Sequence, residues 1–292
     1  MHDDRVLVEA RIERVLHERL RPAVHSQAVP LSVEAWHAPG EPVPVAEALA
    51  AAYSPVQPGE AWGPAWGTSW FHVTGTVPQA WSGRTVEAVV DLGFAVDRPG
   101  FSAEALVHRP DGSAVKGLNP TNTWVRLGDP VQGGEEVDLY VEAASNPLVD
   151  GVGTPVGDVL TAGREPLYRV RRVVAAVFEQ AVWELVQDVE VLSQLMHELS
   201  TDDPRRWDLL RALERAVDAL DLQDLPGTAP AARQALAGAL ASPAHASAHR
   251  VSAVGHAHID SAWLWPLRET VDRKSTRLNS SHIQKSRMPS SA

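Results

Sequence analysis

The sequence predicts a multidomain α+β protein with an N-terminal β-sandwich, a helical linker, and then the first strand of a truncated α/β barrel. Residues 30–147 consist of short segments rich in valine, threonine and aromatic residues, punctuated by glycine and proline. Residues 165–241 keep apolar side chains at helical spacing. A short apolar run is then followed directly by three polar side chains, those of His256, His258 and Asp260. The strands of α/β barrels have their catalytic residues at this C-terminal end.

A short amphipathic helix is expected within the lead-in segment of residues 1–29. Its apolar residues recur near helical spacing among arginine and glutamate, and they are Val6, Leu7, Ala10, Ile12, Val15, Leu16 and Leu20. Pro22 is expected to end the helix, because proline has no backbone N–H and its ring clashes with the preceding turn.

Strands are expected throughout the predicted sandwich domain, residues 30–150. Residues 70–78 and 85–94 read as strands, and residues 103–117 read as a hairpin whose turn is Pro110-Asp111-Gly112. Residues 135–144 alternate apolar and polar side chains, which predicts a half-buried strand.

Four of the ten tryptophans cluster within residues 62–81 of this predicted domain, at Trp62, Trp66, Trp70 and Trp81. Aromatic side chains often form sugar-binding platforms, so a carbohydrate-binding surface is one interpretation. Packing in the core and at its edges is the favoured interpretation, because aromatic side chains bury large areas.

Helices are expected over residues 165–241 of a linker that spans 151–245. The apolar stripe consists of Leu167, Val170, Val173, Val174, Val177, Ala181, Leu185, Val189, Leu192, Met196 and Leu199. Asp203 and Pro204 then read as an N-cap followed by proline in the first turn of a helix that runs to about Leu222. Leu225-Pro226-Gly227 is interpreted as a break, with a third helix over about 230–241.

Composition excludes several classes of protein. The net charge of −11 argues against a nucleic-acid or anionic-membrane partner, and the absence of cysteine excludes disulfides and thiolate metal sites. The charged N-terminal segment is not a signal peptide, and no apolar run is long enough to cross a membrane. We therefore expect a soluble cytoplasmic protein.

The segment HRVSAVGHAHIDSAWLWP begins at His249 and contains the main candidate site. Val251, Ala253 and Val254 predict a short buried strand. Alternate residues of an extended strand point the same way, so the side chains of His256, His258 and Asp260 can share a face. Imidazole and carboxylate ligands suit zinc, with Co²⁺ or Mn²⁺ as alternatives.

GHAHIDSAWLWPLRET (255–270) resembles the opening strand of the catalytic domain in glycoside hydrolase family 38, the α-mannosidases. Three segments resemble the N-terminal sandwich of the cytosolic and vacuolar branch of that family: WGPAWGTSWFHVTGTVP (62–78), PGFSAEALVHRPDGSAVKGLNP (99–120) and VDLYVEAASNP (137–147). REPLYRVRRVVAAVFEQAVWEL (164–185) resembles its helical linker. One departure is Ser261, where threonine would be expected.

The resemblance implies roles for particular residues in 246–271, the start of a truncated catalytic domain. His258 and Asp260 match the first two zinc ligands of the family, and Trp263 matches an aromatic residue that stacks against the bound mannose ring. His256 is not assigned as a ligand, and Trp265 and Pro266 are interpreted as structural. The nucleophile and the acid/base are expected beyond Val271, so this chain has no assigned catalytic residue.

The same resemblance implies that the full-length protein hydrolyses α-mannosides or oligomannose with retention of configuration. Whether the full-length protein forms a homo-oligomer stays open. The truncated chain itself is expected to be inactive. Two other readings stay open: a non-catalytic carbohydrate-binding sandwich, and a fragment of a metal-dependent amidohydrolase, a class that also uses a His-x-His at the end of a barrel strand.

Residues 272–292 differ from the rest of the chain. They contain two lysines and six serines, whereas Lys116 is the one lysine among residues 1–271. DRKSTRLNSSH (272–282) back-translates to the codons of a common short-read sequencing adapter. We expect this tail to be a library artefact without a fold of its own.

Overall fold

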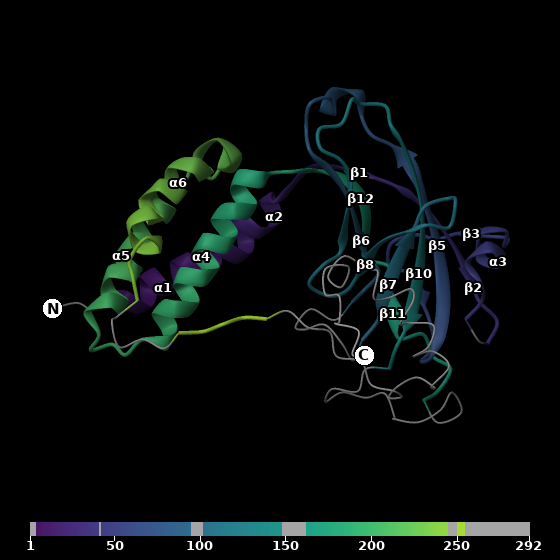
Figure 1. Ribbon diagram of the computed structural model, residues 1–292, viewed down its shortest axis with the longest axis horizontal. Coiled ribbons are helices and arrows are strands. Elements are labelled where there is room, and N and C mark those ends of the chain that lie inside the picture. Colours follow the sequence, from purple (N-terminus) through teal and green to yellow (C-terminus); the bar gives the residue numbers. More distant parts are fainter. Residues whose placement is uncertain (1–3, 41, 95–101, 148–161, 245–249, 255–292) are drawn as a thin grey trace, which may run out of the picture. The chain divides into compact units, whose positions relative to one another are not determined.

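The computed structural model describes residues 4–40, 42–94, 102–147, 162–244 and 250–254. The chain divides into two compact units, of which one combines Met1–Ala28 with Val177–Val251 and the other is built on Val29–Ala176 (Figure 1). The first unit is helical and the second is a β-sandwich, so the α+β class predicted from the sequence is confirmed.

The sandwich unit contains two main sheets and one small one. The six-stranded sheet has the order β3-β2-β5-β10-β7-β8 and the four-stranded sheet has the order β1-β12-β6-β9, while β11 pairs with β4. The strands are β1 (His25–Pro30), β2 (Ser32–His37), β3 (Ser54–Pro55), β4 (Ala61–Trp62), β5 (Gly67–Thr76), β6 (Val86–Asp91), β7 (Glu104–His108), β8 (Ala114–Leu118), β9 (Trp124–Gly128), β10 (Glu136–Ser145), β11 (Tyr168–Arg169) and β12 (Arg172–Phe178). Two short helices, α3 (Val45–Leu49) and η2 (Gln79–Trp81), lie between strands.

The four strand segments expected in the sandwich are confirmed. β5 and β10 pair antiparallel along their whole length, and the inward side chains of β10 alternate with outward ones, as at Val137, Leu139 and Val141. The predicted hairpin is formed by β7 and β8. Its turn is closed because the Asp111 side chain accepts the Ser113 N–H and Gly112 takes a left-handed φ of 83°.

The helical unit brings together segments from distant parts of the sequence. Its helices are α1 (Arg5–Val15), η1 (Leu16–Leu20), α2 (Arg21–Ala23), α4 (Gln180–Glu198), α5 (Pro204–Asp218) and α6 (Leu225–Leu240). Their apolar faces share one core, to which the N-terminal segment contributes Ile12, Val15, Leu16 and Leu20. Val6 and Leu7 of the predicted stripe are instead exposed.

The N-terminal helix continues slightly past the proline that was expected to end it. Residues Leu16–Leu20 form a π-helical turn in which the Arg21 N–H donates to the Leu16 carbonyl, five residues back. The helix then runs through Pro22 to Ala23. π turns are rare and occur mostly as single turns inside α-helices, as here.

Two predictions for the linker are wrong. Tyr168–Arg169 and Arg172–Phe178 are strands rather than helix, and β12 lies between β1 and β6 in the four-stranded sheet. Leu225-Pro226-Gly227 is the first turn of α6 rather than a break, because Asp224 caps the helix by accepting the Gly227 N–H at 3.0 Å. The predicted cap at Asp203 is confirmed by its 2.8 Å hydrogen bond from the Arg205 N–H, although α5 ends at Asp218 and not near Leu222.

No helix within the described residues is both long and apolar enough to span a membrane.

Candidate functional site

The candidate metal motif lies outside the described residues. This applies to His256, His258, Asp260, Trp263 and the WLWP segment that follows. The residues just before it, 250–254, are described and have no regular secondary structure. Val251 and Val254 are 88% and 82% exposed, so the buried strand predicted at Val251–Val254 is not found. A parallel strand forms only beside a hydrogen-bonded neighbour, and no described strand pairs with this segment.

The part of the chain that the structure describes offers no alternative metal centre. Among the residues that the structure describes, no three histidine, aspartate or glutamate side chains are grouped so that they could hold a metal ion. His258 and Asp260 therefore stay the candidate ligands. An imidazole nitrogen and a carboxylate oxygen are donors of the right kind for zinc, but catalytic zinc sites use three protein ligands or more.

Three of the four tryptophans clustered within residues 62–81 are core residues. Trp62, Trp70 and Trp81 are at most 5% exposed. The Trp62 indole N–H donates to the Leu92 carbonyl at 2.7 Å, and the Trp62 ring packs edge-on against Phe71 with centroids 5.4 Å apart. For these three residues the structure supports packing over a sugar-binding role, and the fourth, Trp66, is partly exposed.

A second aromatic group, which the sequence did not indicate, lies across three parts of the sandwich. His72 of β5 stacks on Tyr140 of β10 at 4.2 Å, and Tyr53 lies edge-on to both rings. His72 Nε2 lies 2.9 Å from a carboxylate oxygen of Asp138. Burial raises the pKa of Tyr53 to about 12, and its hydroxyl donates to the Ala48 carbonyl, so this group is best explained as packing of the segment after α3 on the sheet.

A charged group connects β6, β8 and β9. Glu87 is fully buried and Arg126 Nη2 lies 3.0 Å from its carboxylate, while Lys116 Nζ lies over the Trp124 ring. Burial lowers the pKa of Lys116 to about 8, an effect that the nearby Glu87 carboxylate opposes and the Arg126 guanidinium adds to. The ammonium lies over one face of the Trp124 ring and the carboxylate is paired with Arg126, so the group favours a structural role.

We expect the stability of the sandwich to rise between about pH 8 and pH 10. Below this range Lys116 is protonated in both folded and unfolded chains, and the penalty of burying its charge is complete. Within it the unfolded chain binds the proton and the folded chain does not, so the free energy of unfolding increases with pH. Urea unfolding at several pH values measures this. Lys116→Met should abolish the rise, and an unchanged slope in that variant would contradict the assignment.

The helical unit has a shallow groove of about 330 Å³ between α5 and α6. Arg205, Arg211 and Arg215 line it beside small residues. Arg205 donates to the carbonyls of Ser242 and Pro243, and Arg211 pairs with Asp208. Because two of the three arginines already have internal partners, we assign no ligand to this groove.

Comparison with known proteins agrees with the arrangement of these parts. Residues 29–176 match the family described as α-mannosidase, jelly roll domain, and residues 248–290 match the glycosyl hydrolases family 38 N-terminal domain. Human alpha-mannosidase 2C1 is 33% identical over 265 residues, which is 88% of this chain and 24% of the human protein. The mouse protein of the same name is 32% identical over 246 residues, 81% of this chain and 22% of its own length.

A solved structure, the β-glucuronidase of Ruminococcus gnavus, matches 53% of this chain and 30% of its own at 12% identity, with a TM-score of 0.36. That score is too low to support any statement about the present fold. The chain spans about a quarter of the length of the curated relatives it matches.

A jelly-roll domain followed along the chain by a match to the family 38 domain thus places the chain in the glycoside hydrolase class. More narrowly, the chain belongs to the α-mannosidases of glycoside hydrolase family 38, in the branch that includes alpha-mannosidase 2C1.

Proposed function

We propose that the chain is a section of a retaining, zinc-dependent α-mannosidase that hydrolyses terminal α-mannosides in the cytoplasm. The observation that carries the proposal is the segment GHAHIDSAWLWP within residues 248–290, the part that matches the family 38 domain. The names of the curated relatives support the substrate class. An amidohydrolase would not account for the match of residues 29–176 to an α-mannosidase jelly roll.

His258 and Asp260 would hold the zinc ion, through an imidazole nitrogen and a carboxylate oxygen. When bound, the ion would supply electrostatic positioning of sugar hydroxyls. Trp263 would stack its indole against the apolar face of the mannose ring and so orient it. Both metal-binding side chains must be deprotonated at their ligating atoms, which makes the affinity for zinc fall at acidic pH.

Retention of configuration requires two carboxyl groups, one as nucleophile and one as acid/base. Asp260 is assigned to the metal and not to the nucleophilic role. No residue of the chain is assigned to either role. We therefore propose that the 292-residue chain has no turnover of its own, and that further ligands in the whole protein complete the metal site.

The test compares the 292-residue chain with the full-length protein read from the source genome, using an aryl α-mannoside. We expect turnover by the full-length protein alone, loss of that turnover on chelation, and retention of the anomeric configuration in the product as followed by NMR. Chelator-sensitive turnover by the 292-residue chain would contradict its proposed inactivity, and an inverted product would contradict the retaining mechanism.

We also propose that residues 272–292 derive from a sequencing adapter. The match to the family 38 domain continues to residue 290, which runs against a break after Val271. The nucleotide sequence decides between the two, because codons that differ from the adapter across this segment would exclude the artefact.

A further inference from the structure

The N-terminal helix α1 is apolar on two sides. One side contributes residues such as Ile12 to the core of the helical unit. On the opposite side Val6, Leu7 and Ala10 lie together, because residues three and four apart share a helix face. Val6 and Leu7 are 62% and 75% exposed. The Leu7 N–H donates to the Asp4 carbonyl at 2.9 Å, so this group, called here the α1 patch, belongs to the hydrogen-bonded first turns of the helix.

The outward side of α1 becomes polar beyond the patch. It continues with Arg14, which is exposed, and with His17, whose half-exposed ring lies 3.2 Å from the Glu13 carboxylate. Single exposed apolar side chains are normal, whereas a contiguous apolar group next to charged residues is typical of a contact surface. A helix that is apolar all round is buried on all sides. The first two turns of α1 therefore have the composition of a helix that is covered twice.

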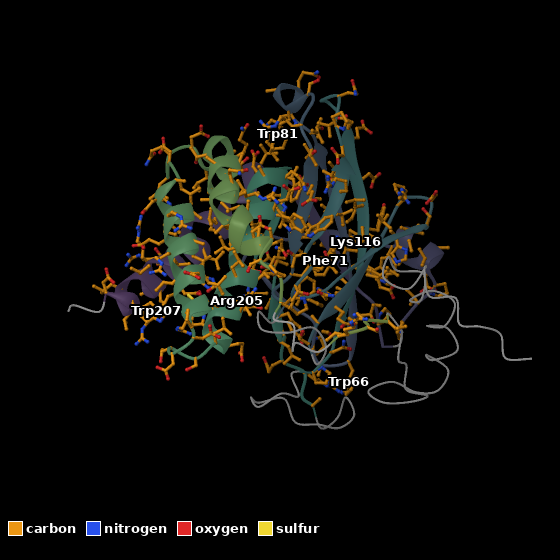
Figure 2. The ribbon with its side chains drawn as sticks, turned by 60° about the vertical axis from the view of Figure 1, so that its left-hand side comes forward. Trp66, Phe71, Trp81, Lys116, Arg205 and Trp207 are labelled. Atoms are coloured by element: carbon orange, nitrogen blue, oxygen red, sulfur yellow. The ribbon has the colours of Figure 1, made fainter. Side chains whose placement is uncertain are left out.

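The α1 patch lies at the end of the helical unit where the chain leaves it. The Arg206 guanidinium donates to the Glu9 carboxylate of α1 at 2.7 Å, and that of Arg205 donates to the Pro243 carbonyl, just after α6, at 3.2 Å. Two consecutive residues at the start of α5 thus contact α1 and the segment that follows α6. Figure 2 shows Trp207, in the first turn of α5, next to the purple α1.

The family 38 domain begins close to this same end. Its match starts at residue 248, whereas α6 ends at Leu240. Residues 241–247 between them span at most about 25 Å even when fully extended. The chain spans about a quarter of the length of its curated relatives, so most of a family 38 protein lies beyond it. A much larger domain therefore follows within a short distance of the α1 patch.

We propose that the part of the family 38 domain that lies beyond this chain packs on the α1 patch in the full-length protein. The domain buries Val6 and Leu7 and so covers the second side of α1. Since the patch has no charged side chain of its own, its partner surface is expected to be apolar. The proposal rests on the family match and not on the proposed activity, so a full-length protein without turnover would still test it.

The test uses introduced cysteines, because the chain has none of its own. Leu7→Cys is made in the 292-residue chain and in the full-length protein read from the source genome. The control is Leu222→Cys, since Leu222 is 43% exposed and lies between α5 and α6 at the opposite end of the helical unit. Modification by a small maleimide is followed by mass spectrometry of the peptide that contains the new cysteine.

We expect Leu7→Cys to react at least about tenfold more slowly in the full-length protein than in the 292-residue chain, because a buried thiol reacts only through local opening. Leu222→Cys should react at the same rate in both, within about twofold. Val6→Cys provides a second position with the same expectation as Leu7→Cys. Leu7→Gln should leave the melting temperature of the 292-residue chain within about 1 °C and lower that of the full-length protein by about 2 °C or more.

Equal rates for Leu7→Cys in the two proteins would overturn the proposal. Slow modification in the 292-residue chain itself would also overturn it, because the patch would then be covered within the chain. Protection in the full-length protein that disappears on dilution to the monomer would assign the patch to a second copy instead. An equal loss of melting temperature in both proteins on Leu7→Gln would show that the side chain acts within the helical unit.

Discussion

Replacing Arg206 by methionine is expected to lower the free energy of unfolding of the helical unit by about 3–5 kcal/mol. Arg206 lies at the start of α5, and its guanidinium donates to the Met196 and Leu199 carbonyls at the end of α4 and to the Glu9 carboxylate at 2.7 Å. The side chains of Arg206 and Glu9 are 9% and 18% exposed. Removing the cation leaves a carboxylate and two helix-terminal carbonyls without their partner in a largely dry environment.

Urea unfolding followed by circular dichroism at 222 nm measures this change. Arg211→Met is the matched control, because Arg211 lies on the same helix and pairs with Asp208 while both side chains are more than half exposed. Exposed pairs of this kind contribute less than about 1 kcal/mol. Equal losses in the two variants would show that burial of the Arg206 pair has no special importance.

Phe71→Ala is expected to destabilise the sandwich by about 3–5 kcal/mol. Phe71 is fully buried on β5, and its ring contacts Trp62, which in turn packs on Tyr168 with centroids 5.1 Å apart. The three aromatic residues come from β5, β4 and β11 and so join the six-stranded sheet to the small two-stranded one. Truncation removes the transfer free energy of the ring and leaves a cavity that rigid neighbours cannot fill.

Phe71→Leu should lose no more than about 1.5 kcal/mol, because most of the buried volume is kept. Unfolding followed by tryptophan fluorescence reports on this region, since Trp62 and Trp70 flank the site. Similar losses for leucine and alanine would mean that the ring edge contact with Trp62, rather than the filled volume, determines stability.

The sandwich was predictable wherever local patterns coincide with burial. In β10 the alternation of Val137, Leu139 and Val141 with polar residues matches the two faces of the strand. Asp111-Gly112 supplies its own turn chemistry, and Asp203 supplies its own helix cap, so both features depend on neighbours within a few residues. All the residues that produce such a signal lie within a short stretch of the sequence, so it can be recognised without the structure.

The wrong predictions concern features that depend on distant residues. The valine-rich segment that forms β12 also fits helical spacing, and its strand conformation follows from pairing with β1 and β6, which no local window contains. The number of tryptophans likewise does not reveal which are buried. For Leu225-Pro226-Gly227 a local signal did exist: Asp224 before Leu225-Pro226 is a cap with proline in the first turn.

The candidate functional residues show the same difference between local signals and features that depend on distant residues. The metal motif was found from residue types and spacing within a dozen positions, and it lies outside the described residues, so its geometry stays a prediction. The left-handed backbone of Trp66, with φ +70°, gave no local sign beyond its flanking glycines. Its conformation is enforced by Ser145, nearly eighty residues further along the chain, and only a folded structure brings the two together.

The joining of α1 to α4, α5 and α6 has a consequence for biosynthesis. Ile12 and Leu16 are synthesised about 200 residues before their partners in α5 and α6, which is roughly 10–40 s at ordinary elongation rates. Throughout that interval the first helix carries an apolar stripe with nothing to cover it, while the intervening jelly roll can already fold. Chaperone capture of nascent chains should therefore concentrate on α1 and η1, and deleting these two helices would expose the apolar faces of α4, α5 and α6.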